Sequence, residues 1–311
     1  MLRLDGSGEE RAPRPCAVTI GMFDGVHRGH LAVLEVLGAH AASRGLDRAV
    51  ITFRAHPKAV TLGHAPPSIT SFEHRLALLE RAGVDLVLAL EFDAALRATD
   101  PEQFLRHFVV DRLRARSLVL GWDSKFGRDR AGNLESIVPL ARELGLELQS
   151  VGAVSLQGRP VSSTAIREAI SLGDLLGARE MLGRDPSLYG QVVPGARRGR
   201  ELGFPTANLA LDHELKPPSG VYAVRALLRD PALGNETWRP GVMNLGERPT
   251  FARDAEATCE VHLLDFSGDL YGRWIEVAIV RRLRDIQRFA SIDELRSAIA
   301  ADAAAARAIL G

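Results

Sequence analysis

A glycine-rich turn between an apolar run and a helical pattern constrains the first half of the chain more than any other feature. A short apolar run at residues 17–20 leads into residues 21–30, which contain three glycines. Apolar residues then recur three and four positions apart, at Leu31, Val33, Leu34 and Leu37. This order predicts a strand, a tight turn and a helix. The free N–H groups and the positive end of such a helix form an anion site, where His27 and His30 can face the same phosphate.

Length and charge limit the class of protein. The chain has 311 residues, of which 46% are hydrophobic, enough for two domains with separate cores. Its 39 basic and 39 acidic side chains balance. We therefore expect no nucleic-acid partner and no membrane surface, so that any anion site is local. The sequence does not indicate an oligomeric state.

Cysteine usage and the N-terminus bear on location. Cys16 and Cys259 lie in different halves of the chain and have no metal-binding spacing. No charged leader precedes an apolar core, and no apolar run reaches the roughly 18 residues of a membrane span. A reducing cytoplasm is therefore expected. The first fourteen residues combine two glycines, one proline and charges, which predicts a mobile tail.

Strand-like runs alternate with helical patterns through the first half. The runs lie at 17–21, 48–53, 85–91, 117–121 and 146–151. Such alternation predicts a Rossmann-like parallel sheet with helices on both faces. Ser71 and Asp100 are expected to cap helices that follow them. Ligands bind at the carboxyl ends of such strands, so His56-Pro57 and residues 121–127 should open on the same edge as the glycine turn.

The segment 161–167 is expected to begin the last helix of this half. Its hydroxyl groups can simply cap the helix, since Ser and Thr accept from orphan N–H groups. Arg167 follows Ser163 by four residues and therefore shares its helical face. There it could add a charged fork to the phosphate site.

A glycine- and proline-bearing stretch at 183–186 is the predicted domain boundary. Beyond it, short β-rich runs follow one another without intervening helices, at 191–193, 221–228, 237–244, 258–264 and 274–280. This pattern predicts a small antiparallel barrel. A C-terminal helix from 292 to 310 is expected, with Ser291 as its cap.

The segment 190–208 is rich in glycine, which allows backbone N–H groups to approach a phosphate closely. The same glycines could instead form only tight β-turns, which is the interpretation that glycine spacing by itself favours. The segment is not a Walker A loop, because no Gly-Lys-Ser/Thr follows.

Motifs in both halves share one resemblance. In the first half they are residues 21–30, His56-Pro57 and residues 162–167. In the second half they are residues 202–208, 241–246, 248–250, 260–262, 265–266, 269–272 and 283–285. Together they resemble the prokaryotic bifunctional riboflavin kinase/FMN adenylyltransferase (FAD synthetase) family. The resemblance implies an α/β nucleotidyltransferase domain over 15–183 and a flavokinase barrel over 186–311.

For the first domain the resemblance implies attack of the FMN phosphate on the α-phosphate of ATP, giving FAD and pyrophosphate. His27 and His30 would donate to the ATP phosphates, and Ser163 and Arg167 would hold the pyrophosphate. The other implied ATP contacts are Gly21, Phe23, Asp24, Gly29 and Thr164, and the implied flavin contacts are His56, Pro57 and Asp123. Asp24 could instead brace the glycine turn through its carboxylate.

For the second domain the resemblance implies transfer of the γ-phosphate of ATP to riboflavin. Glu260 matches the base of the family, although alternation alone leaves it equally an outward-facing strand residue. Thr206 and Asn208 would bind Mg²⁺ and phosphate, as expected for a hard cation that retains waters. The implied further contacts are Gly195 and Gly203 for ATP and Arg284 for the flavin. Arg198 and Arg200 could touch phosphate or be solvated.

Two positions depart from the family pattern. Met22 stands where Asn is common, and Ser124 replaces a Phe. Loss of that Phe would weaken flavin binding, whereas Met22 can point into the core. Two alternatives therefore stay open, namely a riboflavin kinase with a degenerate adenylyltransferase domain and a flavin- or nucleotide-binding regulator without turnover.

Overall fold

A computed structural model describes residues 1–128, 131–195, 199, 202–211, 215–229, 235–247 and 257–311. The chain forms two compact units, Met1–Ala165 and Ile166–Gly311. Among the described residues, no helix combines the length and apolar character needed to cross a membrane.

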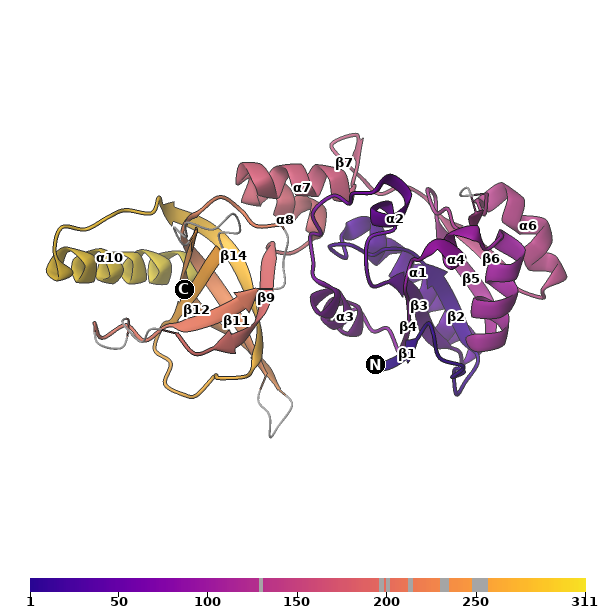
Figure 1. Ribbon diagram of the computed structural model, residues 1–311, viewed down its shortest axis with the longest axis horizontal. Coiled ribbons are helices and arrows are strands. Elements are labelled where there is room, and N and C mark those ends of the chain that lie inside the picture. The colour runs from indigo at the N-terminus through magenta and orange to yellow at the C-terminus, as the bar shows by residue number, and fades with distance from the viewer. Residues whose placement is uncertain (129–130, 196–198, 200–201, 212–214, 230–234, 248–256) are drawn as a thin grey trace. The chain divides into compact units, whose positions relative to one another are not determined.

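The first unit is built on a six-stranded parallel sheet, in the order β1-β4-β3-β2-β5-β6 (Figure 1). The strands are β1 (Leu2–Asp5), β2 (Cys16–Ile20), β3 (Asp47–Phe53), β4 (Leu86–Leu90), β5 (Ala115–Gly121) and β6 (Glu147–Val151). The chain leaves β2 towards β3 and β4 and later returns to its other side at β5. The strand order therefore reverses at β2, and this is where ligands bind in open α/β sheets.

Helices cover both faces of this sheet, as predicted. On one face Val50 and Val87 pack with Leu37 of α1 (Arg28–Arg44) and Leu76 of α3 (Phe72–Arg81). On the other face the next residues along the strands, such as Ile51 and Leu88, pack with α5 (Pro101–Phe104), the π-helix η1 (Leu105–Arg112) and α6 (Leu134–Glu143). Successive strand residues alternate between faces, so both layers are apolar. The predicted caps Ser71 and Asp100 are confirmed, since each accepts from a backbone N–H three residues on. Short elements complete the unit: α2 (Lys58–Leu62), α4 (Ala94–Ala98), β7 (Ser155–Leu156) and β8 (Arg159–Pro160).

The prediction of a mobile N-terminal tail was wrong. β1 pairs with β4 in register from Leu2 with Leu86 to Asp5 with Ala89. The guanidinium of Arg112 is buried and donates to three carbonyl groups at and after the end of β1. They belong to Asp5 (2.8 Å), Gly6 (2.9 Å) and Glu10 (3.0 Å). The backbone polar groups of the segment are thus satisfied by the sheet and by one buried cation.

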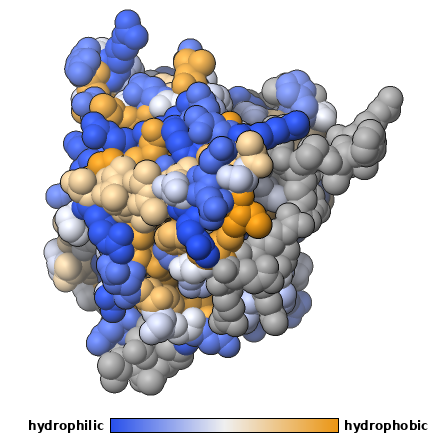
Figure 2. All heavy atoms as spheres, turned by 90° about the vertical axis from the view of Figure 1, so that its left-hand side faces the viewer, coloured by the Kyte–Doolittle hydropathy of each residue, from blue (hydrophilic) through white to orange (hydrophobic). Residues whose placement is uncertain are grey.

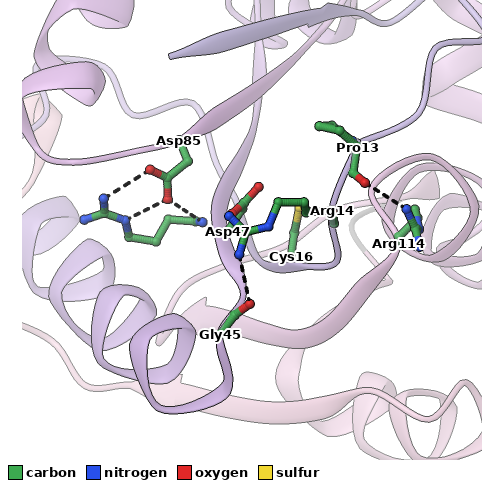
Figure 3. Close-up of polar contacts among 8 residues, drawn as sticks. Pro13, Arg14, Cys16, Gly45, Asp47, Asp85 and Arg114 are labelled. Carbon is green, nitrogen blue, oxygen red and sulfur yellow. Dashed lines mark hydrogen bonds and ion pairs between the residues drawn. The ribbon is translucent and has the colours of Figure 1, made fainter.

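Two hydrogen bonds and one ion pair fix the same segment at the amino ends of the central strands. Figure 3 shows Arg14 at the carbonyl of Gly45 and Arg114 donating to the carbonyl of Pro13. Arg14 also pairs with Asp47 at 3.0 Å. These contacts lie at the edge of the sheet opposite to the glycine turn, because all strands are parallel.

The second unit is a closed antiparallel barrel, as predicted, in the order β10-β13-β12-β11-β14-β9. Its strands are β9 (Ser187–Val193), β10 (Ala207–Leu211), β11 (Gly220–Arg229), β12 (Glu236–Glu247), β13 (Ala257–Leu263) and β14 (Trp274–Arg284). Alternate residues such as Tyr222, Met243 and Val261 fill the barrel, and their neighbours along each strand point outwards. The helices α7 (Ser163–Leu172) and α8 (Leu175–Leu182) precede it.

The C-terminal helix α10 (Ile292–Leu310) has the predicted bounds. Ser291 caps it by accepting from the N–H of Glu294, whose carboxylate accepts from Ala290 N. Ala303, Ala306 and Leu310 pack on Val221 and Ala223 of β11. Figure 2 shows a face of the molecule on which hydrophilic side chains are interspersed with smaller hydrophobic groups.

Candidate active sites

His27 is the N-cap residue of α1, and His30 lies in its first turn. The Nδ1 atom of His27 accepts from His30 N (3.4 Å), and the Nδ1 atom of His30 accepts from His27 N (3.3 Å). The rings stack, with centroids 3.6 Å apart and planes inclined by 15°. Two histidines thus take the places that Ser and Glu hold in an ordinary capping box.

The tautomers of both rings follow from these bonds. A nitrogen that accepts from an N–H carries no proton of its own. Each neutral ring therefore carries its proton on Nε2, where it is a donor. Two N–H donors on stacked rings at a helix N-terminus suit a phosphate.

Backbone strain shapes the turn that leads to the two histidines. Phe23, Gly25 and Val26 have φ values of 52°, 82° and 39°. Positive φ costs a residue with a side chain energy, and such strain concentrates at functional sites. A β-carbon added at Gly29 would lie 3.1 Å from Cε1 of His27, so glycine leaves room for the ring there. The ring of Phe23 lies 4.9 Å from that of His30.

Asp24 braces the glycine turn through its carboxylate. It is 2% exposed, and its carboxylate accepts from the N–H groups of Ile69 (2.9 Å) and Thr70 (3.0 Å). The Thr70 hydroxyl in turn accepts from Gly25 N at 3.0 Å. These bonds favour the bracing alternative for Asp24, and its contact with ATP stays a prediction.

Arg75 is a residue of this site that the sequence did not reveal. It is 1% exposed, and its Nη1 donates to the carbonyls of Met22 (2.8 Å) and Phe53 (2.8 Å). Burial lowers its pKa to about 10, still far above neutrality, so the guanidinium is charged. A buried cation thus ties the start of the glycine turn to the end of β3. Met22 packs against the core, as expected for a residue leaving the strand.

The start of α7 contacts the glycine turn. The hydroxyl of Ser163 donates to the carbonyl of Asp24 at 3.3 Å, although these residues are 139 positions apart. Thr164 is exposed at the next position. Arg167 lies one helical turn further, in the second unit, and its contact with pyrophosphate stays a prediction.

The loops predicted to contact flavin follow the strands on either side of β2. His56 and Pro57 come after β3, and His56 Nδ1 accepts from Lys58 N at 3.1 Å. Asp123 comes after β5 and is exposed. Because β3, β2 and β5 are parallel neighbours, the three loops open on one edge of the sheet.

Three polar residues form a row across neighbouring strands of the barrel. Glu260 of β13 is directly opposite Asn208 of β10 on one side and Asn244 of β12 on the other. Cys259 and Val261 point into the barrel core, so Glu260 and its two partners lie on the outer surface. None of the three side chains has a hydrogen bond among the described residues.

Glycines crowd the side chains next to this row. A β-carbon at Gly195 would lie 2.2 Å from Nδ2 of Asn208, and one at Gly199 would lie 3.2 Å from Oγ1 of Thr206. Gly203 has a φ of 88°, which glycine adopts without strain. Close backbone approach is thus a property of this segment, as expected for a loop around phosphate.

Other predicted contacts of the second unit have a structural role or lie outside the described residues. Arg284 makes a bidentate ion pair with Asp302 of α10, at 2.9 and 2.7 Å, and its Nη1 donates to the Asp285 carbonyl. Its contact with flavin stays a prediction. Arg198, Arg200 and residues 248–250 lie outside the described residues.

Comparisons with known proteins cover nearly the whole chain. A family model described as FAD synthetase matches residues 9–165, and one described as riboflavin kinase matches residues 182–310. A bifunctional riboflavin kinase/FMN adenylyltransferase of Pseudomonas fluorescens is 40% identical over 296 residues, which cover 95% of this chain and 93% of the relative. The relative of that name from Escherichia coli K12 is 39% identical over 297 residues, with 95% and 93% covered.

A solved structure has the same architecture. It comes from Streptococcus pneumoniae and is described as a macrolide-efflux protein. It is 29% identical, covers 99% of both chains and has a TM-score of 0.82.

The fold and the two sites define a class of protein, a transferase of phosphorus-containing groups that joins a nucleotidyltransferase-like sheet to a kinase barrel. Within that class, the chain belongs to the bifunctional riboflavin kinase/FMN adenylyltransferase family.

Proposed function

We propose that this chain phosphorylates riboflavin to FMN on its barrel and adenylylates FMN to FAD on its parallel sheet, with ATP as co-substrate of both steps. The observation that carries the proposal is the row of Asn208, Glu260 and Asn244, which places a carboxylate between two amides beside a glycine-rich loop. The histidine pair at the sheet edge supports the second activity.

In the kinase step, the ribityl 5′-oxygen forms a bond to the γ-phosphorus of ATP while the bond to the β-phosphate oxygen breaks. The hydroxyl is a poor nucleophile, so a carboxylate that takes its proton assists the attack. Glu260 is the residue proposed for this role. ADP leaves with the electron pair of the broken bond.

Magnesium fits the residues beside Glu260. The Thr206 hydroxyl and the Asn208 amide carbonyl offer hard oxygen ligands. Mg²⁺ takes ligands of this kind from proteins while it retains several of its water molecules. Gly195 leaves room beside the amide, since a β-carbon there would overlap it. When bound, the cation would offset charge on the ATP phosphates. Thr206 and Asn208 would hold it, and Gly203 and Gly195 would let the backbone approach the phosphates.

In the adenylyltransferase step, an oxygen of the FMN phosphate attacks the α-phosphorus of ATP, and pyrophosphate leaves. No protein nucleophile is needed, because the step depends on alignment of two anions and on offsetting charge. His27 and His30 would donate from Nε2 to the ATP phosphates. Ser163 and Arg167 would hold the departing pyrophosphate.

The chromatographic test is direct. Purified protein incubated with riboflavin, ATP and Mg²⁺ is expected to yield FMN first and FAD later. FMN without FAD, even when FMN is supplied, would select the kinase with a degenerate adenylyltransferase domain. Tight flavin binding with unchanged ATP would select the regulator. Neither product, with reduced or oxidised flavin, would reject the proposal.

The domain ranges and the location remain proposals. We propose that residues 15–183 and 186–311 delimit the two activities. Cys16 and Cys259 are free and buried, which accords with a reducing cytoplasm.

A further inference from the structure

We propose that His262 is a positioning residue of the kinase site, which holds the segment carrying Thr206 against the strand that carries Glu260. The inference rests on the proposed kinase activity and goes beyond it, because His262 is given no contact with substrate. Its only role is to fix the distance between the cation-binding residues and the base.

His262 shares a surface with Glu260. The two residues are two positions apart on β13, and Val261 between them is fully buried in the barrel. Both side chains therefore lie on the outer face. A change at His262 is thus a change beside the site rather than in the core.

The ring of His262 contacts the segment that leads to Thr206. Its Nδ1 atom lies 2.8 Å from the carbonyl oxygen of Pro205, 57 residues away in the chain. The ring of Phe204 approaches the imidazole edge-on, with centroids 5.5 Å apart and planes inclined by 85°. One hydrogen bond and one aromatic contact thus join residues 204–205 to β13.

This anchor matters because Thr206 stands just outside the barrel ladder. The ladder of β10 begins at Ala207, and Pro205 has no N–H to donate to any strand. On its other side, Phe204 N donates to the carbonyl of Gly199 in the glycine-rich segment. The Pro205 carbonyl is therefore the backbone group through which β13 can hold this turn in place.

The chemistry of the bond fixes the tautomer of the ring. A carbonyl oxygen can only accept, so the bond requires a proton on Nδ1 of His262. This is the opposite assignment to that of His27 and His30, whose Nδ1 atoms accept. The proposal thus predicts a property of one named nitrogen atom.

Two amide substitutions separate that nitrogen from the rest of the ring. The side-chain NH₂ of asparagine can take the place of Nδ1, whereas that of glutamine reaches the place of Nε2. We expect His262→Gln to raise the Mg²⁺ and ATP concentrations that half-saturate FMN formation about five- to tenfold, the size of one lost hydrogen bond. His262→Asn should stay within about twofold of the unsubstituted protein in both, because it keeps the donor.

Three outcomes overturn the inference. The first is an unchanged half-saturating concentration of Mg²⁺ and ATP in His262→Gln. The second is equal impairment of the Asn and Gln variants. The third is a lower maximal rate and melting temperature with unchanged half-saturating concentrations, which indicates general destabilisation. FAD formation from supplied FMN is the internal control and should not change. Absence of FMN formation in the unsubstituted protein would reject the proposed function instead.

A spectroscopic measurement on the unsubstituted protein tests the proposal without requiring that any variant folds. The ¹⁵N resonances of His262 in the unsubstituted protein should identify Nδ1 as a protonated nitrogen. A neutral ring protonated at Nε2 alone would contradict the Pro205 bond and with it the positioning role.

Discussion

The two candidate sites differ in how their side chains are held. In the first unit, His27 and His30 bond to each other's backbone, and Asp24 of the same turn is buried. In the second unit, the side chains of Glu260 and its amide neighbours lie on the outer face of a barrel and make no hydrogen bonds among the described residues. The side chains of the first site also stabilise the turn and the helix that position them. The side chains of the second site lie on a barrel whose strand pairing does not depend on them.

This difference determines what a substitution reports. At the glycine turn, the groups proposed to bind phosphate also cap a helix and close a strained loop, so stability and activity should fall together. On the barrel, cross-strand pairing fixes the positions of side chains whose removal leaves the ladder intact. There, activity should fall while stability stays.

The largest effect is expected for Glu260→Gln. The amide keeps the shape of the side chain but takes no proton, so kcat for FMN formation should fall by about 10²- to 10⁴-fold. The melting temperature should hardly change, because the side chain is partly exposed on the outer surface. FAD formation from supplied FMN serves as the matched control. FMN formation at the original rate would remove Glu260 from the proposed mechanism.

His30→Ala tests the first site, where activity and stability are expected to fall together. Loss of a charge-stabilising donor is expected to slow FAD formation by about 10²-fold. Loss of the bond from His27 N to His30 should cost about 1 kcal/mol of unfolding free energy as well. FMN formation should be spared, and the exposed His107, changed to Ala, provides a control. Retained FAD synthesis in His30→Ala would show that the first site is misplaced.

A pair of glycine substitutions sharpens the comparison through stability. Gly25 and Gly203 have similar φ values, 82° and 88°. A β-carbon at Gly25 would meet Ile69 at 3.1 Å, whereas one at Gly203 has no neighbour within 4 Å. Gly203→Ala should cost about 1 kcal/mol for the left-handed backbone alone. Gly25→Ala should cost about 2 kcal/mol or more. Urea unfolding measures both, and equal losses would contradict the difference in packing.

The smallest effect concerns the two thiols, where the units should behave alike. Burial raises the pKa of Cys16 and that of Cys259 to about 12 each. At pH 8, about one thiol in 10⁴ is then a thiolate, the form that reacts. Iodoacetamide should label both cysteines far more slowly in the native protein than after unfolding, and the native rate should rise about tenfold for each pH unit below the pKa. Mass spectrometry of the peptides measures this, and rapid native labelling at pH 8 would contradict the burial of that thiol.

Much of the fold could be predicted because continuous apolar runs mark buried parallel strands. Besides the short β7 and β8, the strands β1 and β10 were missed, and these two show the limit. In β1, charged Arg3 and Asp5 alternate with leucines at the edge of the sheet, and only pairing with β4 identifies the strand. β10 follows directly on the glycine-rich loop, whose composition masks the ladder.

The sites could be predicted only as far as motifs reach. The motifs predict roles for His27, His30, Thr206 and Glu260, but they could not choose between two roles for Asp24, because Ile69 and Thr70 are 45 and 46 residues away. In the sequence, Arg75 looks like an ordinary charged residue on the polar face of an amphipathic helix. Its burial depends on tertiary packing, which the sequence around it does not show.

The register of β12 also lies beyond what motifs convey. Asn244 interrupts an apolar run at Met243 and Leu245, which is a signal in the sequence. Its place beside Glu260 nevertheless requires the register of the two strands.

Mixing two variants tests the central claim, that one chain holds two independent sites, most directly. With riboflavin, ATP and Mg²⁺, Glu260→Gln alone should form almost no product and His30→Ala alone should stop at FMN. A mixture of the two should form FAD, because FMN made on one chain can be adenylylated on the other. No FAD from the mixture, or loss of both activities in either single variant, would contradict the account.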